Sequence, residues 1–112
     1  MVGSRPMASR PESSAAVAVR VLAARDRAAR RLAETPWPVN AHIPASALRR
    51  DWAPSPGASR CIEQAIQVGQ ISERSAAAVI RVAWTLADLA GKDLPDRDEC
   101  QNALQLRLGV AE

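Results

Sequence analysis

The chain has 112 residues, a length that allows one domain with a modest core and leaves no room for a substantial second unit. Fifteen basic residues, all but one of them arginine, outweigh twelve acidic residues to give a net charge of +3, which permits contact with nucleotides or nucleic acid without requiring it. Alanine is abundant, the only aromatic residues are three tryptophans, and no alternating strand pattern of useful length is present. The composition therefore predicts an all-α fold.

Residues 1–13 are rich in proline and serine and contain no periodic apolar pattern. We expect them to form a flexible lead-in or linker. Residues 14–112 are expected to form one helical domain.

The first predicted helix begins after Ser13 or Ser14 and runs to about Glu34, where two prolines follow within four residues. Its apolar residues recur at intervals of three and four and form one stripe. Off this stripe lie four arginines: Arg20, Arg27, Arg30 and Arg31. They have two interpretations, an ordinary solvated face or a possible nucleic-acid surface.

Two shorter segments follow. Residues 39–43 are predicted to be a connecting loop, with His42 as an ordinary loop residue, and a short helix is expected to begin at Pro44 and to cover residues 45–50. A third helix is predicted over residues 58–68, and Gly69 is expected to cap it.

The most apolar segment, residues 71–91, is predicted to be a central helix. Ser72 stands where an N-cap belongs, and Gly91 is suited to the left-handed conformation that ends a helix. Because apolar residues surround most of its circumference, we expect other helices to pack around it. Its few polar residues form a single stripe, consisting of Arg74, Arg81, Thr85 and Asp88.

A last helix is predicted to start at Asp96, with Glu99 three residues later in a capping-box arrangement, and to end at Gly109. The expected architecture is thus a small helical bundle of four main helices plus one short helix.

The sequence lacks the motifs of several kinds of catalytic and binding site. There is no glycine-rich phosphate-binding loop, no acidic pair placed to hold magnesium and no nucleophile–histidine set. Cys61 and Cys100 lie far apart and lack neighbouring ligands, so no metal site is expected. No apolar run reaches the ~18–20 residues of a membrane span, and the start lacks a signal peptide. We expect a cytoplasmic chain that is no enzyme by itself.

Specific motifs nevertheless carry a resemblance. The segment ISERSAAAVIRVAWTLADLAG followed by DRDECQNALQLRLG has an S-x-R pattern (Ser72, Arg74), an R-V-A-x-T-[IL]-A-D-L-x-G pattern (residues 81–91) and a final A-L-x-x-R (residues 103–107). Asn40, Ile43 and Pro44 match an N-x-x-[IL]-[PS] turn. Together they resemble the C-terminal helical domain, or lid, of magnesium-chelatase-like AAA+ ATPases of the YifB/ComM type.

The resemblance implies that this chain is the lid of a larger ATPase, with the core of the same chain and neighbouring subunits of a hexameric ring as partners, and that ATP and Mg are cofactors of the parent protein and not of this fragment alone. It implies that Arg74 is the sensor-2 residue, which reaches the γ-phosphate of the nucleotide. Ser72, Arg81 and Asp88 would form a supporting stripe, in which Arg81 and Asp88 make a structural pair or hold the neighbouring subunit. The parent would act on DNA.

Two alternatives stay open at this point: a free-standing nucleic-acid-binding module that uses the arginines of the first helix, and a protein-interaction bundle. Trp84 departs from the family pattern, since many relatives have arginine at that position. The tryptophan either removes a polar contact or enlarges the core.

Overall fold

The computed structural model describes residues 13–111, so residues 1–12 of the predicted lead-in over residues 1–13 lie outside this range, and Ser13 is the N-cap of the first helix. Within it the all-α prediction is confirmed. The helices are α2 (Ser14–Arg31), the 3₁₀ turn η1 (Asn40–His42), α3 (Ala45–Leu48), α4 (Pro56–Gln67), α5 (Glu73–Ala90) and α6 (Arg97–Ala111), and no strand occurs in this range.

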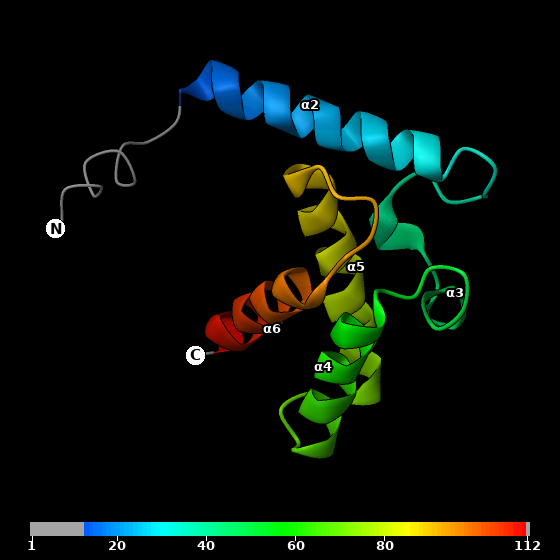
Figure 1. The fold of residues 1–112 in the computed structure, drawn as a ribbon, viewed down its shortest axis with the longest axis vertical. Helices are drawn as coiled ribbons and strands as arrows, with labels where there is room; N and C mark the ends of the chain where they lie inside the picture. The colour runs from blue at the N-terminus through cyan, green and yellow to red at the C-terminus, as the bar shows by residue number, and fades with distance from the viewer. Residues whose placement is uncertain (1–12, 112) are drawn as a thin grey trace, which may run out of the picture.

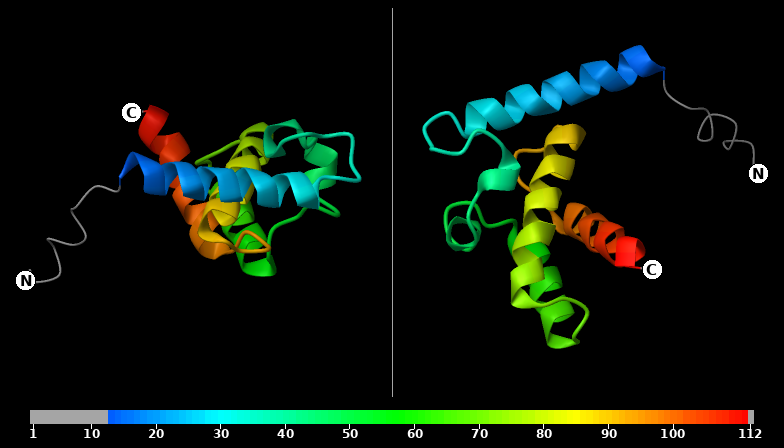
Figure 2. Two further views of the ribbon diagram at one scale, coloured as in Figure 1. Left: turned by 90° about the horizontal axis from the view of Figure 1, so that it is seen from above. Right: turned by 180° about the vertical axis from the view of Figure 1, so that it is seen from behind.

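Helix α5 is the centre of the bundle, as its apolar circumference predicted. It contacts every other described element: α4 and α6 pack along its sides, and α2 crosses its C-terminal end (Figures 1 and 2). Its buried side chains include Val79, Ile80, Ala83 and Trp84, and they form one apolar cluster with residues of α3, α4 and α6. Burial of this cluster is the main stabilising contribution to the fold.

The ends of α5 follow the predicted chemistry. The Ser72 hydroxyl accepts a hydrogen bond from the Ser75 amide at 3.1 Å, and Gly91 adopts the left-handed conformation with φ of 76°. One of the two hydrogen bonds of the predicted α6 capping box is present, since the Asp96 amide donates to the Glu99 carboxylate at 2.8 Å, and the Asp96 carboxylate accepts from the Ser55 hydroxyl at 2.9 Å.

Several predicted boundaries were wrong. Helix α2 ends at Arg31 and not near Glu34, and the Thr35 hydroxyl then bonds the Leu32 carbonyl at 2.8 Å. Helix α4 begins two residues early, because Ser55 caps it and Pro56 suits its first turn. Helix α6 continues through Gly109 to Ala111, since one glycine weakens a helix by only ~1 kcal/mol and need not end it.

Two short predictions were also inexact. Helix α3 ends at Leu48, before the expected Arg50, and the predicted loop over residues 39–43 contains the turn η1. His42 is exposed in this turn. The first turns of α2 stand clear of the bundle, and residues 13–20 are all exposed.

Candidate functional site

Arg74 lies in the first turn of α5, with its side chain exposed. Its two neighbours are engaged: Glu73 pairs with Arg49 at 2.9 Å, and the Ser75 hydroxyl accepts from Arg107 at 3.2 Å. Among the described residues, no ion pair or hydrogen bond holds the Arg74 guanidinium. Arg74 thus adds an exposed positive charge to a helix N-terminus, an end that already favours anions.

Arg81 and Asp88 do not pair with each other. The Arg81 Nε donates to the Ile43 carbonyl at 2.7 Å and fastens the segment after η1 to the middle of α5. Asp88 instead binds Arg31 of α2. The expectation of a structural Arg81–Asp88 pair is corrected, because Arg81 bonds to the segment after η1, whereas Asp88 bonds to Arg31 of α2 and to Asn40 of η1.

Arg31 and Asp88 form a partly buried ion pair with two contacts. Arg31 Nη1 lies 2.6 Å from Asp88 Oδ1, and Nη2 lies 2.8 Å from Oδ2. Asn40 completes the group: its amide oxygen accepts from Arg31 at 2.9 Å, and its amide nitrogen donates to Asp88 at 2.9 Å. The Arg31 guanidinium also lies 4.4 Å from the centroid of a Trp84 ring. We call these four residues the α2–α5 clamp, because they join α2 and η1 to the C-terminal half of α5.

The clamp accounts for two of the sequence motifs. Asn40 opens the N-x-x-I-P motif and Asp88 belongs to the A-D-L motif, and the structure brings the two within hydrogen-bond distance. Asn40 is 7% exposed, and the sequence reasoning named it in a motif without predicting that it is buried and bonded to Arg31 and Asp88. Its signal was present in the motif itself, since a polar residue fixed in a loop next to apolar neighbours is typical of a buried hydrogen-bonded group.

The four arginines of α2 that the sequence offered as a nucleic-acid surface face different surroundings. Arg31 forms its ion pair with Asp88, and Arg30 pairs with Asp26 in its own helix at 3.2 Å. Arg20 is exposed and also interacts with another group. Arg27 is half-buried, and its guanidinium lies against Gly91, at the C-terminal end of α5. That end carries a partial negative charge that attracts a cation. Arg31 in particular belongs to the interior of the fold and not to a nucleic-acid surface.

Trp84 enlarges the core and keeps a polar contact. The residue is 2% exposed, its indole nitrogen donates to the Trp52 carbonyl at 2.9 Å, and the two rings meet edge to face with centroids 5.8 Å apart. The ring therefore fills the space between α5 and the segment that precedes α4.

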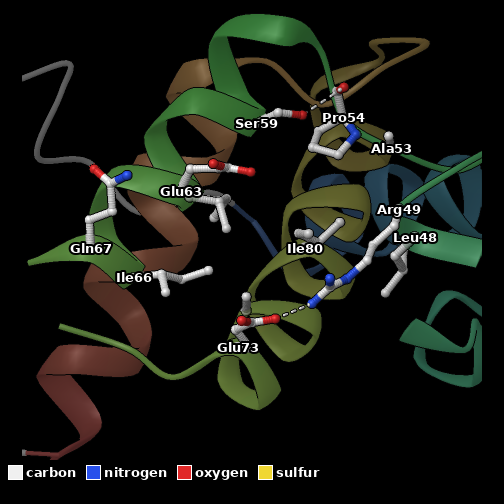
Figure 3. Close-up of a pocket in the computed structure, with 12 residues that line it drawn as sticks. Leu48, Arg49, Ala53, Pro54, Ser59, Glu63, Ile66, Gln67, Glu73 and Ile80 are labelled. Carbon is white, nitrogen blue, oxygen red and sulfur yellow. Dashed lines mark hydrogen bonds and ion pairs between the residues drawn. The ribbon is translucent and has the colours of Figure 1, made fainter. Parts of the chain in front are cut away.

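A groove of about 500 Å³ opens between α3, α4 and the first half of α5 (Figure 3). Its lining includes the apolar residues Leu48, Ile62 and Ile80, and the Arg49–Glu73 ion pair also lies along it. Arg74 does not line it. The groove and Arg74 are thus separate features of the same end of α5.

Two titratable groups on α6 are perturbed. Burial raises the pKa of the Glu99 carboxyl, but hydrogen bonds from Lys92 and from the Asp96 amide outweigh this effect and leave the pKa below its ordinary value. Burial raises the pKa of the Cys100 thiol to about 12. A thiol in this state is a poor nucleophile at neutral pH, because the thiolate is the reactive form.

Within residues 13–111, no three His, Cys, Asp or Glu side chains gather as metal ligands, and none of the helices combines the length and apolar character that crossing a bilayer requires.

Comparison with known proteins finds one matching family and several similar proteins. The family model described as magnesium chelatase, subunit ChlI C-terminal, matches residues 11–107. Uncharacterized proteins of Mycobacterium bovis and of two strains of Mycobacterium tuberculosis are each 40% identical over 96 residues. The match covers 86% of this chain and 19% of each relative, so the chain spans about a fifth of the length of these proteins. No solved structure matches significantly.

Proposed function

Because the chain belongs to the family of magnesium chelatase ChlI C-terminal domains, we propose that it is the helical lid of an AAA+ ATPase of the YifB/ComM type and that Arg74 is its sensor-2 residue. The lid adds this arginine to a nucleotide site whose phosphate-binding loop belongs to the core of the parent protein. The parent works as a hexameric ring that binds ATP with Mg and acts on DNA in the cytoplasm.

The observation that carries this proposal is the state of Arg74. Twelve of the other residues of α5 lie buried or half-buried, and Glu73 and Thr85 bond to Arg49 and Asn40, whereas Arg74 is exposed at the helix N-terminus. Its neighbours Glu73 and Ser75 contact Arg49 and Arg107, and the buried Ala76 and Ala77 anchor this end of the helix in the core. A guanidinium that is charged at all working pH values and held at an anion-favouring helix end suits contact with a γ-phosphate.

The α2–α5 clamp supports the mechanical part of the proposal. A lid that senses the γ-phosphate transmits hydrolysis as rigid-body motion only if its helices move together. The clamp fixes α2 to the end of α5 opposite Arg74, so a displacement of Arg74 would carry α2 with it (Figure 1). Arg81 and Ile43 add a second tie midway along α5.

The test is ATP hydrolysis by the full-length parent carrying Arg74→Ala, with Arg60→Ala as a matched control. Arg60 is also exposed, but it lies on α4. We expect Arg74→Ala to lower kcat by about 100-fold, the scale for loss of one preorganised transition-state donor, while ring assembly and ADP binding persist. Arg60→Ala should hydrolyse ATP at the wild-type rate. Equal rates for the two variants and the wild type would overturn the sensor assignment.

A further inference from the structure

The motif A-L-x-x-R ends on Arg107, and the structure brings this residue of α6 to the first turn of α5. Arg107 Nη2 donates to the Ser75 hydroxyl at 3.2 Å, although the two residues lie 32 positions apart in the sequence. Ser75 directly follows Arg74, so standard bond lengths place this nitrogen within about 10 Å of the Arg74 Cα atom. The proposed sensor therefore has a second arginine beside it, supplied by another helix.

The charge of Arg107 is not neutralised within residues 13–111. In this range its one bonded partner is the uncharged Ser75 hydroxyl, and it forms no ion pair. Glu73, in the first turn of α5, pairs instead with Arg49 at 2.9 Å. Two exposed guanidinium groups, those of Arg74 and Arg107, thus lie at this turn, and no carboxylate of the described residues is bonded to either.

The stability of the fold does not explain this arrangement. The N-terminal end of a helix has a partial positive charge, so a cation there is less favourable than an anion. The two guanidinium groups also repel each other. A single hydrogen bond to an exposed hydroxyl offsets little of this cost. A local arrangement that lowers stability is typical of a functional site, and an anion with several negative charges would neutralise both arginines.

We propose that Arg107 is a second determinant of nucleotide recognition, whose positive charge strengthens binding of the triphosphate at the end of α5 that carries Arg74. This inference rests on the proposed function, because it adds a residue to the same site. The hydrogen bond to Ser75 directs the Arg107 guanidinium toward that end of α5. ATP carries more negative charge than ADP, so the charge of Arg107 should strengthen the binding of ATP more than that of ADP.

The test separates the charge of Arg107 from its hydrogen bond, in the full-length parent. Arg107→Gln removes the charge and keeps an amide donor, whereas Arg107→Lys keeps the charge. Arg97→Gln is the matched control, because Arg97 is also exposed, forms no ion pair with a described residue and lies at the opposite end of α6. The measurement is the Kd of a non-hydrolysable ATP analogue and the Kd of ADP, each at low and at high salt.

We expect Arg107→Gln to weaken binding of the ATP analogue about fivefold, the scale of one charge near a phosphate at an exposed site, and binding of ADP by about twofold or less. The effect should shrink in about 0.5 M salt, because salt screens it. Arg107→Lys and Arg97→Gln should bind both nucleotides like the wild type.

A wild-type Kd for Arg107→Gln, equal weakening of both nucleotides, or a lysine variant as weak as the glutamine variant would overturn the inference. Arg74→Ala, measured beside these variants, tests the sensor role separately. If it binds both nucleotides normally while Arg107→Gln binds the analogue weakly, the sensor assignment fails and the role of Arg107 stands.

Discussion

Removing the carboxylate of Asp88 should lower the free energy of unfolding more than breaking an exposed ion pair does. The Asp88→Ala variant leaves the Arg31 guanidinium without its anion, in a place where its side chain is only 15% exposed. It also deprives Asn40 of an acceptor. Breaking a buried pair in this way costs 3–5 kcal/mol in general, and because some water reaches Arg31 we expect a loss of about 3 kcal/mol in the free energy of unfolding.

For a domain of this size such a loss corresponds to a fall in Tm of at least ~10 °C. Urea unfolding of the chain, followed by tryptophan fluorescence, measures it directly, since Trp84 lies against Arg31. The control is Arg30→Ala, which removes the exposed Arg30–Asp26 pair and should cost less than about 1 kcal/mol.

A double variant tests whether the loss of stability in Asp88→Ala comes from the charge left without a partner. Arg31→Met combined with Asp88→Leu leaves no charge without a partner, so it should be more stable than Asp88→Ala alone. A loss below about 1 kcal/mol for Asp88→Ala, or equal losses for Asp88→Ala and Arg30→Ala, would refute the assignment of the clamp as the tie between α2 and α5.

Three further predictions concern Glu99 of α6, Gly91 at the C-terminal end of α5, and the two cysteines, Cys61 of α4 and Cys100 of α6. The lowered pKa of Glu99 stabilises the fold above the ordinary value of 4.5, and this contribution disappears as the pH falls through the lower pKa of the folded state. Glu99→Gln should therefore reduce the free energy of unfolding at pH 6 and have less effect at pH 3, and a pH-independent difference would contradict the Lys92–Glu99 pairing. Gly91→Ala should cost about 1 kcal/mol in urea unfolding because φ is 76°, and no loss would argue against the left-handed cap. Under native conditions a thiol reagent should modify half-buried Cys61 well before Cys100, and equal rates would contradict the burial of Cys100.

Local chemistry was enough to predict much of the fold. Ser72 and Gly91 mark the ends of α5 because a hydroxyl N-cap and a left-handed glycine act on backbone groups only a few residues away. The Asp96–Glu99 capping box is equally local. The prediction that α6 ends at Gly109 was wrong, because residue type alone does not distinguish a glycine that ends a helix, such as Gly91, from one inside a helix.

The α2–α5 clamp could not be predicted from local sequence patterns. Arg31 and Asp88 are 57 positions apart, and their pairing depends on α2 crossing the end of α5, which no local pattern specifies. From the sequence Arg31 looked equivalent to Arg30 beside it, although a difference of one residue turns a helical side chain by 100° and separates a partly buried ion pair from an exposed one. The role of Arg74 rests on the family resemblance, and the structure adds its exposed position at the start of α5.

The central claim, that Arg74 senses the γ-phosphate, is tested most directly by nucleotide discrimination in the full-length parent. The measurement compares the Kd of a non-hydrolysable ATP analogue with the Kd of ADP, for the wild type and for Arg74→Ala. A contact to the γ-phosphate predicts that the substitution weakens the analogue by about tenfold, the scale of one charge-assisted hydrogen bond, and leaves ADP within about twofold. Equal changes for both nucleotides, or no change for either, would contradict the account.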